Sequence, residues 1–109
     1  MLQENDIQHR LQFVVRAIGQ AAQAASAERG LPHELRDSIQ RLDKQADSVR
    51  EMLHCIDEAR MRKLIVEMET WAERAKRVCI NIPSLSGQMK GAVNHMHSQI
   101  QELKRDMHI

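Results

Sequence analysis

The feature that most constrains this chain is the spacing of its apolar residues, which recur at intervals of three and four along its whole length. The stripes read Ile7, Leu11, Val14, Ile18, Ala21 and Ala25; then Leu35, Ile39, Leu42, Ala46, Val49, Leu53 and Ile56; then Met61, Leu64 with Ile65, Met68, Trp71 with Ala72, Ala75, Val78 with Cys79, and Ile82; then Leu85, Met89, Ala92 with Val93, Met96, Ile100, Leu103 and Met107. This spacing is typical of amphipathic helices packed nearly parallel or antiparallel. No segment alternates with the period of two that a strand requires. The pattern predicts an all-α fold, and 109 residues suit a single helical domain over 1–109.

Two short segments interrupt the helical pattern. In ERGLPHEL, Gly30 can take the left-handed conformation that ends a helix, and Pro32 suits the first turn of the next one. In NIPSLSG, Pro83 stops a helix, and Ser84 and Ser86 are residues that cap the following one. Long stretches of good helix formers lie between and around these two segments.

The segment between Leu53 and Leu64 permits two architectures, because it holds no Gly or Pro. The stripe changes phase here, since a continued stripe would next reach Arg60, whereas the apolar residue is Met61. If Asp57 caps a new helix, the chain forms an antiparallel bundle of four helices, at about residues 2–29, 33–55, 57–81 and 84–107. Otherwise one helix over 33–81 spans on the order of 70 Å and leaves three helices in all. We favour the four-helix form.

Dimerisation is expected in either architecture. A single long helix could not bury its stripe within its own chain and would need a second copy. In the four-helix form, Phe13 and Val15 widen the first apolar face, and Val66 and Ile80 widen the third. Wide apolar faces on the helices of a small domain often indicate a partner on the second side.

Composition argues against several classes of partner. The formal net charge is +1, from 16 basic and 15 acidic residues, so no general field draws the chain to nucleic acid or to an anionic membrane. Phe13 and Trp71 are the only aromatic residues, which disfavours a protein that stacks bases on aromatic rings. No apolar run is long enough to cross a bilayer, and the N-terminal segment does not resemble a signal peptide. The chain has two cysteines and no recognisable export signal, so we expect both to be free thiols in a cytoplasmic protein.

The histidines do not have the spacing of a metal site. His95 and His97 lie two residues apart, which places them about 200° apart on a helix, one on each side of Met96. No two of the six histidines are three or four residues apart, which is the spacing that chelation on a helix needs. A di-iron bundle needs two Glu-x-x-His motifs, and only Glu51 with His54 supplies one. No metal ion and no other cofactor is therefore expected.

Catalysis is not expected either. Cys55 and Cys79 lack a helix N-terminus in the right sense to activate a thiol, and both fall at or near apolar stripes. Ser84 and Ser86 are accounted for as capping residues. Apolar residues on every stripe leave no evident pocket with fixed polar groups, which an enzyme requires.

These features favour a non-enzymatic protein that binds another protein and acts as a homodimer. Antiactivators, anti-sigma-like factors, chaperone-like proteins and small adaptors share such a design. The expected contact surface is helical and rich in methionine, because methionine side chains repack around different partners. The residues predicted to bind the partner are Met61, Ile65, Trp71, Met89 and Met96.

Two other functions remain alternatives. One is a metal- or cofactor-binding helical bundle. The other is a nucleic-acid accessory protein that uses basic residues on one face of a dimer, namely Arg60, Arg62, Lys63, Arg74, Lys76 and Arg77.

Overall fold

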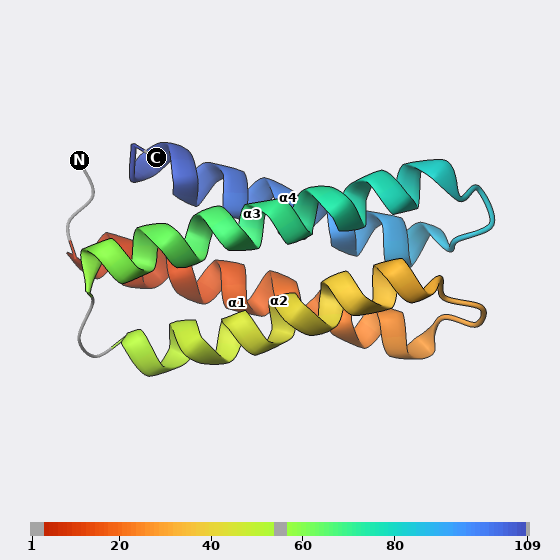
Figure 1. Ribbon diagram of the computed structural model, residues 1–109, viewed down its shortest axis with the longest axis horizontal. Coiled ribbons are helices and arrows are strands. Elements are labelled where there is room, and N and C mark those ends of the chain that lie inside the picture. Colours follow the sequence, from red (N-terminus) through yellow and green to blue (C-terminus); the bar gives the residue numbers. More distant parts are fainter. Residues whose placement is uncertain (1–3, 54–56, 109) are drawn as a thin grey trace.

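A computed structural model describes residues 4–53 and 57–108 of the chain. They form four helices: α1 (Glu4–Ala27), α2 (His33–Met52), α3 (Glu58–Asn81) and α4 (Gly87–Asp106). Each helix packs against two neighbours, in the order α1, α2, α3, α4 and back to α1 (Figure 1). The predicted antiparallel four-helix bundle is confirmed. The alternative of one helix over 33–81 is wrong, because α2 and α3 pack side by side.

Asp57 decides where α3 begins. Its Oδ1 atom accepts a hydrogen bond from the backbone N–H of Arg60 at 3.2 Å, which is the geometry of an N-cap. Its backbone carbonyl accepts the N–H of Met61, the first bond of the new helix. The predicted end of the second helix at residue 55 falls in 54–56, outside the described residues, as do His54, Cys55 and Ile56.

The two other helix junctions depart slightly from the predicted boundaries. Gly30 has φ 69°, the left-handed conformation expected of it, but α1 already ends at Ala27. The fourth helix begins at Gly87 and not at residue 84. The reason is that Ser86 Oγ accepts a hydrogen bond from Met89 N at 3.1 Å, so Ser86 is the cap, while Leu85 before it is buried in the core.

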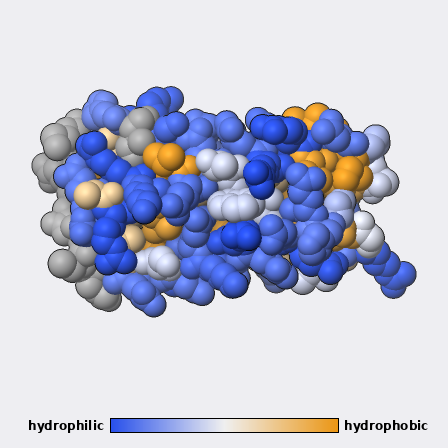
Figure 2. Space-filling model, in the orientation of Figure 1, coloured by the Kyte–Doolittle hydropathy of each residue, from blue (hydrophilic) through white to orange (hydrophobic). Residues whose placement is uncertain are grey.

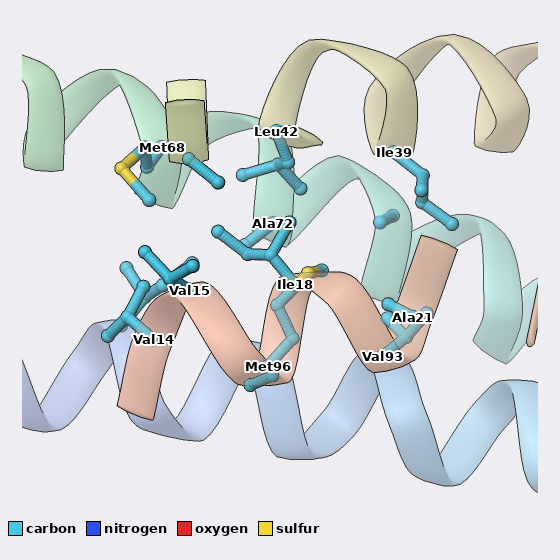
Figure 3. Packing of buried hydrophobic residues seen from close by; sticks show 14 of the residues in the cluster. Val14, Val15, Ile18, Ala21, Ile39, Leu42, Met68, Ala72, Val93 and Met96 are labelled. Atoms are coloured by element: carbon cyan, nitrogen blue, oxygen red, sulfur yellow. The ribbon is translucent and has the colours of Figure 1, made fainter. Parts of the chain in front are cut away.

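The core fills the space between all four helices, and the apolar stripes supply it. Side chains from each helix meet along the bundle axis, among them Ile18, Leu42, Met68 and Met96 (Figure 3). The bundle measures 41 × 22 × 19 Å and has a radius of gyration of 13.7 Å, close to that of a compact chain of this length. The core is complete within one chain, so burial of the stripes does not by itself require a second copy.

Helix α3 carries more apolar residues than the core accepts. In three of its adjacent apolar pairs the second residue is buried and the first is half-buried at the edge of the core. Ile65, Ala72 and Cys79 are the buried members, and the half-buried members are Leu64, Trp71 and Val78. The half-buried set lies at intervals of seven residues and forms a stripe along α3.

Candidate protein-binding surface

Four of the five predicted partner-binding residues lie inside the bundle. Met61, Ile65, Met89 and Met96 have at most 1% of their surface exposed. A partner that docks on the folded chain does not reach them, because the other helices of the same chain cover them. They serve as core residues, and Trp71 is the one member of the set at the surface.

Methionine does not form an exposed surface on this bundle. All six methionines among the described residues are buried: Met52, Met61, Met68, Met89, Met96 and Met107. Their flexible thioethers fill the space between helices, which is the common use of methionine in a core. The expected methionine-rich contact surface is absent from the folded, described part of the chain.

Trp71 lies half-buried on the side of α3 that faces α2, and two guanidinium groups lie against its ring. Arg41 Cζ from α2 lies 4.6 Å from the centre of the indole ring, and Arg74 Cζ from α3 lies 4.9 Å from it. Both distances are within the range of a cation–π contact. Asp37 Oδ2 holds Arg41 Nε at 3.3 Å and so helps to orient its guanidinium.

Two hollows adjoin the half-buried stripe, in the groove between α2 and α3. One has a volume of about 310 Å³ and is lined by Asp37, Gln40, Arg41, Lys44, Gln45 and Trp71. The other has a volume of about 280 Å³ and is lined by Ser48, Met52, Arg60, Lys63, Leu64 and Glu67. We call this surface the α2/α3 groove: the half-buried stripe of Leu64, Trp71 and Val78 with the residues that line these two hollows and Arg74.

The charge of the α2/α3 groove is positive. Five cations lie along it, against two carboxylates: Arg41, Lys44, Arg60, Lys63 and Arg74, against Asp37 and Glu67. Figure 2 shows the face on which α2 and α3 cover the other two helices; it is largely hydrophilic, with small separate apolar areas. The groove is thus a narrow apolar strip between charged edges.

The basic residues named for a nucleic-acid surface do not share one face. Arg60, Lys63 and Arg74 lie at the α2/α3 groove. Arg62 is paired with Glu58 at 3.2 Å, and Lys76 lies near His97 on the side of α3 that faces α4. Helix α3 therefore divides the set, with Lys76 on another side of the helix from the three residues at the α2/α3 groove.

His95 and His97 lie as the sequence predicts, on either side of the buried Met96. His95 is exposed, and His97 is half-buried against α3. Burial lowers the pKa of His97, and the nearby Lys76 lowers it further, while Glu73 and Glu69 act in the opposite direction. Within 4–53 and 57–108, no three His, Cys, Asp or Glu side chains converge as ligands for a metal ion.

Cys79 is a buried thiol packed among apolar side chains. Burial raises its pKa, while Lys90 lowers it and Glu28 raises it to smaller extents. A thiol with a raised pKa is a poor nucleophile at neutral pH. Cys79 therefore has the properties of a core residue.

Comparisons with known proteins do not assign a family. No family model matches the chain, and no curated protein and no solved structure matches it. In the part of the chain that the structure describes, no helix combines the length and the apolar character that crossing a membrane takes. We therefore infer the function from the surfaces of the bundle.

Proposed function

We propose that this chain is a non-enzymatic protein-binding module, of the kind used by helical regulators and adaptors. It holds an amphipathic helix of its partner along the α2/α3 groove. The observation that supports this most directly is Trp71, half-buried at the middle of the apolar stripe, with the guanidinium groups of Arg41 and Arg74 against its ring. The buried thiol of Cys79 suits a reducing cytoplasm, where we propose that the module works.

The apolar part of the groove has the dimensions of a helix-binding seat. Leu64, Trp71 and Val78 are two heptads apart from first to last, which is about 21 Å along α3. A partner helix with apolar residues at intervals of seven would match all three positions. This resembles the helix-in-groove mode of recognition, in which a few anchors on one face carry the contact.

The charge of the groove points to acidic residues at the flanks of the partner helix. The five cations lie on both sides of the apolar stripe, from α2 and from α3. Carboxylates on a docked helix would meet them and would also speed the encounter at low ionic strength. Arg41 and Arg74 would keep Trp71 in place while their outer nitrogens face the partner.

Trp71 is the expected hot spot of the contact. Buried aromatic residues and arginines near the centre of an interface carry most of its binding energy. The Oε1 atom of Gln45, which lines the same hollow as Trp71, is buried and has no hydrogen-bond partner among the described residues. A donor on the partner would satisfy it.

A titration with two helical peptides tests this proposal. Both peptides carry the same leucine heptads, one with glutamates and the other with lysines at the flanking positions. Trp71 is the only tryptophan of the chain, so its fluorescence reports on the groove directly. We expect the acidic peptide to shift the emission to shorter wavelength and to bind more weakly as salt rises. The lysine peptide should produce no shift.

Matched variants give the control. Lys63→Glu should lower the affinity for the acidic peptide by about tenfold. Arg105 is exposed at the end of α4, so Arg105→Glu should leave that affinity unchanged. Random duplex DNA should not compete. Equal binding of both peptides, or no spectral change with either, would contradict the proposal.

A further inference from the structure

Charged residues are distributed unevenly around the bundle. Helix α2 has nine charged residues in 20 and α3 has ten in 24. By contrast, residues 11–27 of α1 carry one charge, Arg16, and residues 87–101 of α4 carry one, Lys90. Because α1 and α4 are neighbours in the bundle, the two charge-poor stretches adjoin. We call the surface that they share the α1/α4 face.

The α1/α4 face has an exposed aromatic ring beside a hollow. Phe13 is 48% exposed on α1. The hollow next to it has a volume of about 430 Å³ and is lined by Arg10, Phe13, Arg16, Ala17, Gln20, His95 and Gln99. The lining residues come from both helices, so the hollow is a shallow groove along their junction.

The charges at one end of this face are already paired within the chain. Arg10 binds Glu102 at 3.0 Å and Asp106 at 3.3 Å, which ties the start of α1 to the end of α4. Neither Arg16 nor Lys90 has a carboxylate within ion-pair distance among the described residues. Covering the centre of the face therefore desolvates very few charges.

The other junctions are less suited to burial against a second copy. Two α2/α3 grooves would repel each other more strongly than two α1/α4 faces, because each groove carries five cations against two carboxylates, whereas the centre of the α1/α4 face carries the two cations Arg16 and Lys90. At the α3/α4 junction, Lys104 and Glu69 form an ion pair at 2.7 Å, and Glu73 and Lys76 lie near His97. A contact there would remove more charged groups from water than one over the centre of the α1/α4 face, and each of them has a desolvation cost. Interface cores are depleted of charged residues, as the α1/α4 face is.

We infer that the α1/α4 face is the contact between two copies of this chain, related by a twofold axis near Phe13. In such an isologous contact each copy offers the same patch. Phe13 and Arg16 lie one helical turn apart, so each guanidinium can stack on the phenyl ring of the other copy. This inference goes beyond the proposed function and leaves both α2/α3 grooves of the dimer open.

The face is large enough for a stable contact. The bundle measures 41 × 22 × 19 Å. The α1/α4 face runs about 24 Å along the bundle axis, at 1.5 Å per residue from Leu11 to Ala27, so two copies would bury on the order of 1,000 Å² in all, near the lower limit for a specific interface.

Sedimentation equilibrium over a dilution series tests the inference, with the full chain and two single variants. We expect the wild-type protein to dimerise at micromolar concentration. Phe13→Asp should raise the dissociation constant of the dimer by at least about tenfold, because it places a charge at the centre of the contact. Val66→Asp is the matched control, since Val66 is 44% exposed on α3 and lies outside the face. It should leave the dimer intact.

Several outcomes would overturn the inference. A wild-type chain that stays monomeric at all concentrations would do so, and so would equal weakening by Val66→Asp. Circular dichroism checks that each variant is folded. If Phe13→Asp unfolds, Gln20→Lys adds a further cation beside Arg10 and Arg16 in the same hollow while keeping the ring, and an unchanged dimer would then contradict the inference. Trp71→Ala should still dimerise, which separates this test from that of the peptide-binding groove.

Discussion

The two halves of this bundle, α1 with α4 and α2 with α3, share one core but differ in their surfaces. Each half contributes apolar residues at the same three-and-four spacing, and the buried side chains are of similar size. Outside the core, α2 and α3 are charged and frame a half-buried tryptophan, whereas α1 and α4 offer glutamines, a histidine and an exposed phenylalanine. The apolar stripes thus specify the fold, while the residues that flank each stripe determine what each face of the bundle can bind.

The largest expected effect tests whether both halves are equally well packed. Ile18→Ala in α1 and Ile65→Ala in α3 remove side chains of the same size from fully buried positions. Each should lower the free energy of unfolding by about 2–5 kcal/mol, measured by urea denaturation. If only one of the two variants lost little free energy of unfolding, its half of the bundle would be loosely packed, and the two halves would not share an equally well-packed core.

A pair of aromatic substitutions sharpens the contrast between the two surfaces. Trp71→Ala removes a half-buried ring and two cation–π contacts, so it should cost about 1–2 kcal/mol of stability. Phe13→Ala should cost about 0.5 kcal/mol in the dilute, monomeric chain, because nearly half of the ring is exposed. Thermal unfolding at low protein concentration measures both. Equal losses would indicate that Phe13 is a core residue and not a contact residue.

The capped turns of the two halves form the next comparison. Asp57→Ala removes the cap of α3, and Ser86→Ala removes the cap of α4 together with the hydrogen bond that Ser86 Oγ donates to Glu28. Each should cost about 1 kcal/mol, with the larger loss for Ser86 because two contacts are lost there. Urea denaturation again provides the measurement. A larger loss for Asp57 would show that the link to Glu28 adds nothing.

The smallest expected effect concerns the pH dependence of the hydrogen bonds between Glu28 and Ser86. Glu28 accepts two hydrogen bonds from Ser86, at its backbone N and at its Oγ, both at 2.8 Å, and these bonds lower the pKa of Glu28. The folded state thus binds the proton less tightly than the unfolded state. The stabilisation is present in full above the unfolded pKa of 4.5 and is lost as the pH falls through the lower, folded value.

Glu28→Gln should therefore flatten the acid limb of the stability curve in that window. The measurement is the free energy of unfolding at several pH values between neutrality and strong acid, for the wild type and the variant. Identical acid limbs would show that the bonds between Glu28 and Ser86 contribute nothing in solution.

Local chemistry was enough to predict most of the fold. Gly30, Asp57 and Ser86 act through their own backbone preferences and short-range hydrogen bonds, so their roles could be read from the chain. The start of α4 was predicted too early because Ser84 and Ser86 are both capping residues. The burial of Leu85, which is a tertiary contact, selects between them.

The candidate site was less accessible to prediction. An apolar residue on a helical stripe can lie in the core or at its edge, and the two positions differ by only one residue in an adjacent pair. Trp71 is half-buried at the edge of the core, but Met61, Ile65, Met89 and Met96 were assigned to a surface although they are buried. The cations around Trp71 come partly from α2, 30 residues earlier in the case of Arg41, and no local pattern joins them.

By itself, then, the amino-acid sequence determined that the chain is helical, where two of its turns lie and which stripe each helix buries, because these depend on interactions between residues a few positions apart. Tertiary structure decided which side of α3 packs against α2 and which arginines contact the indole ring of Trp71. It also decided which two helices adjoin to form a face with few charges. Those features depend on the order in which the helices pack around the core, which brings together residues that are distant along the chain.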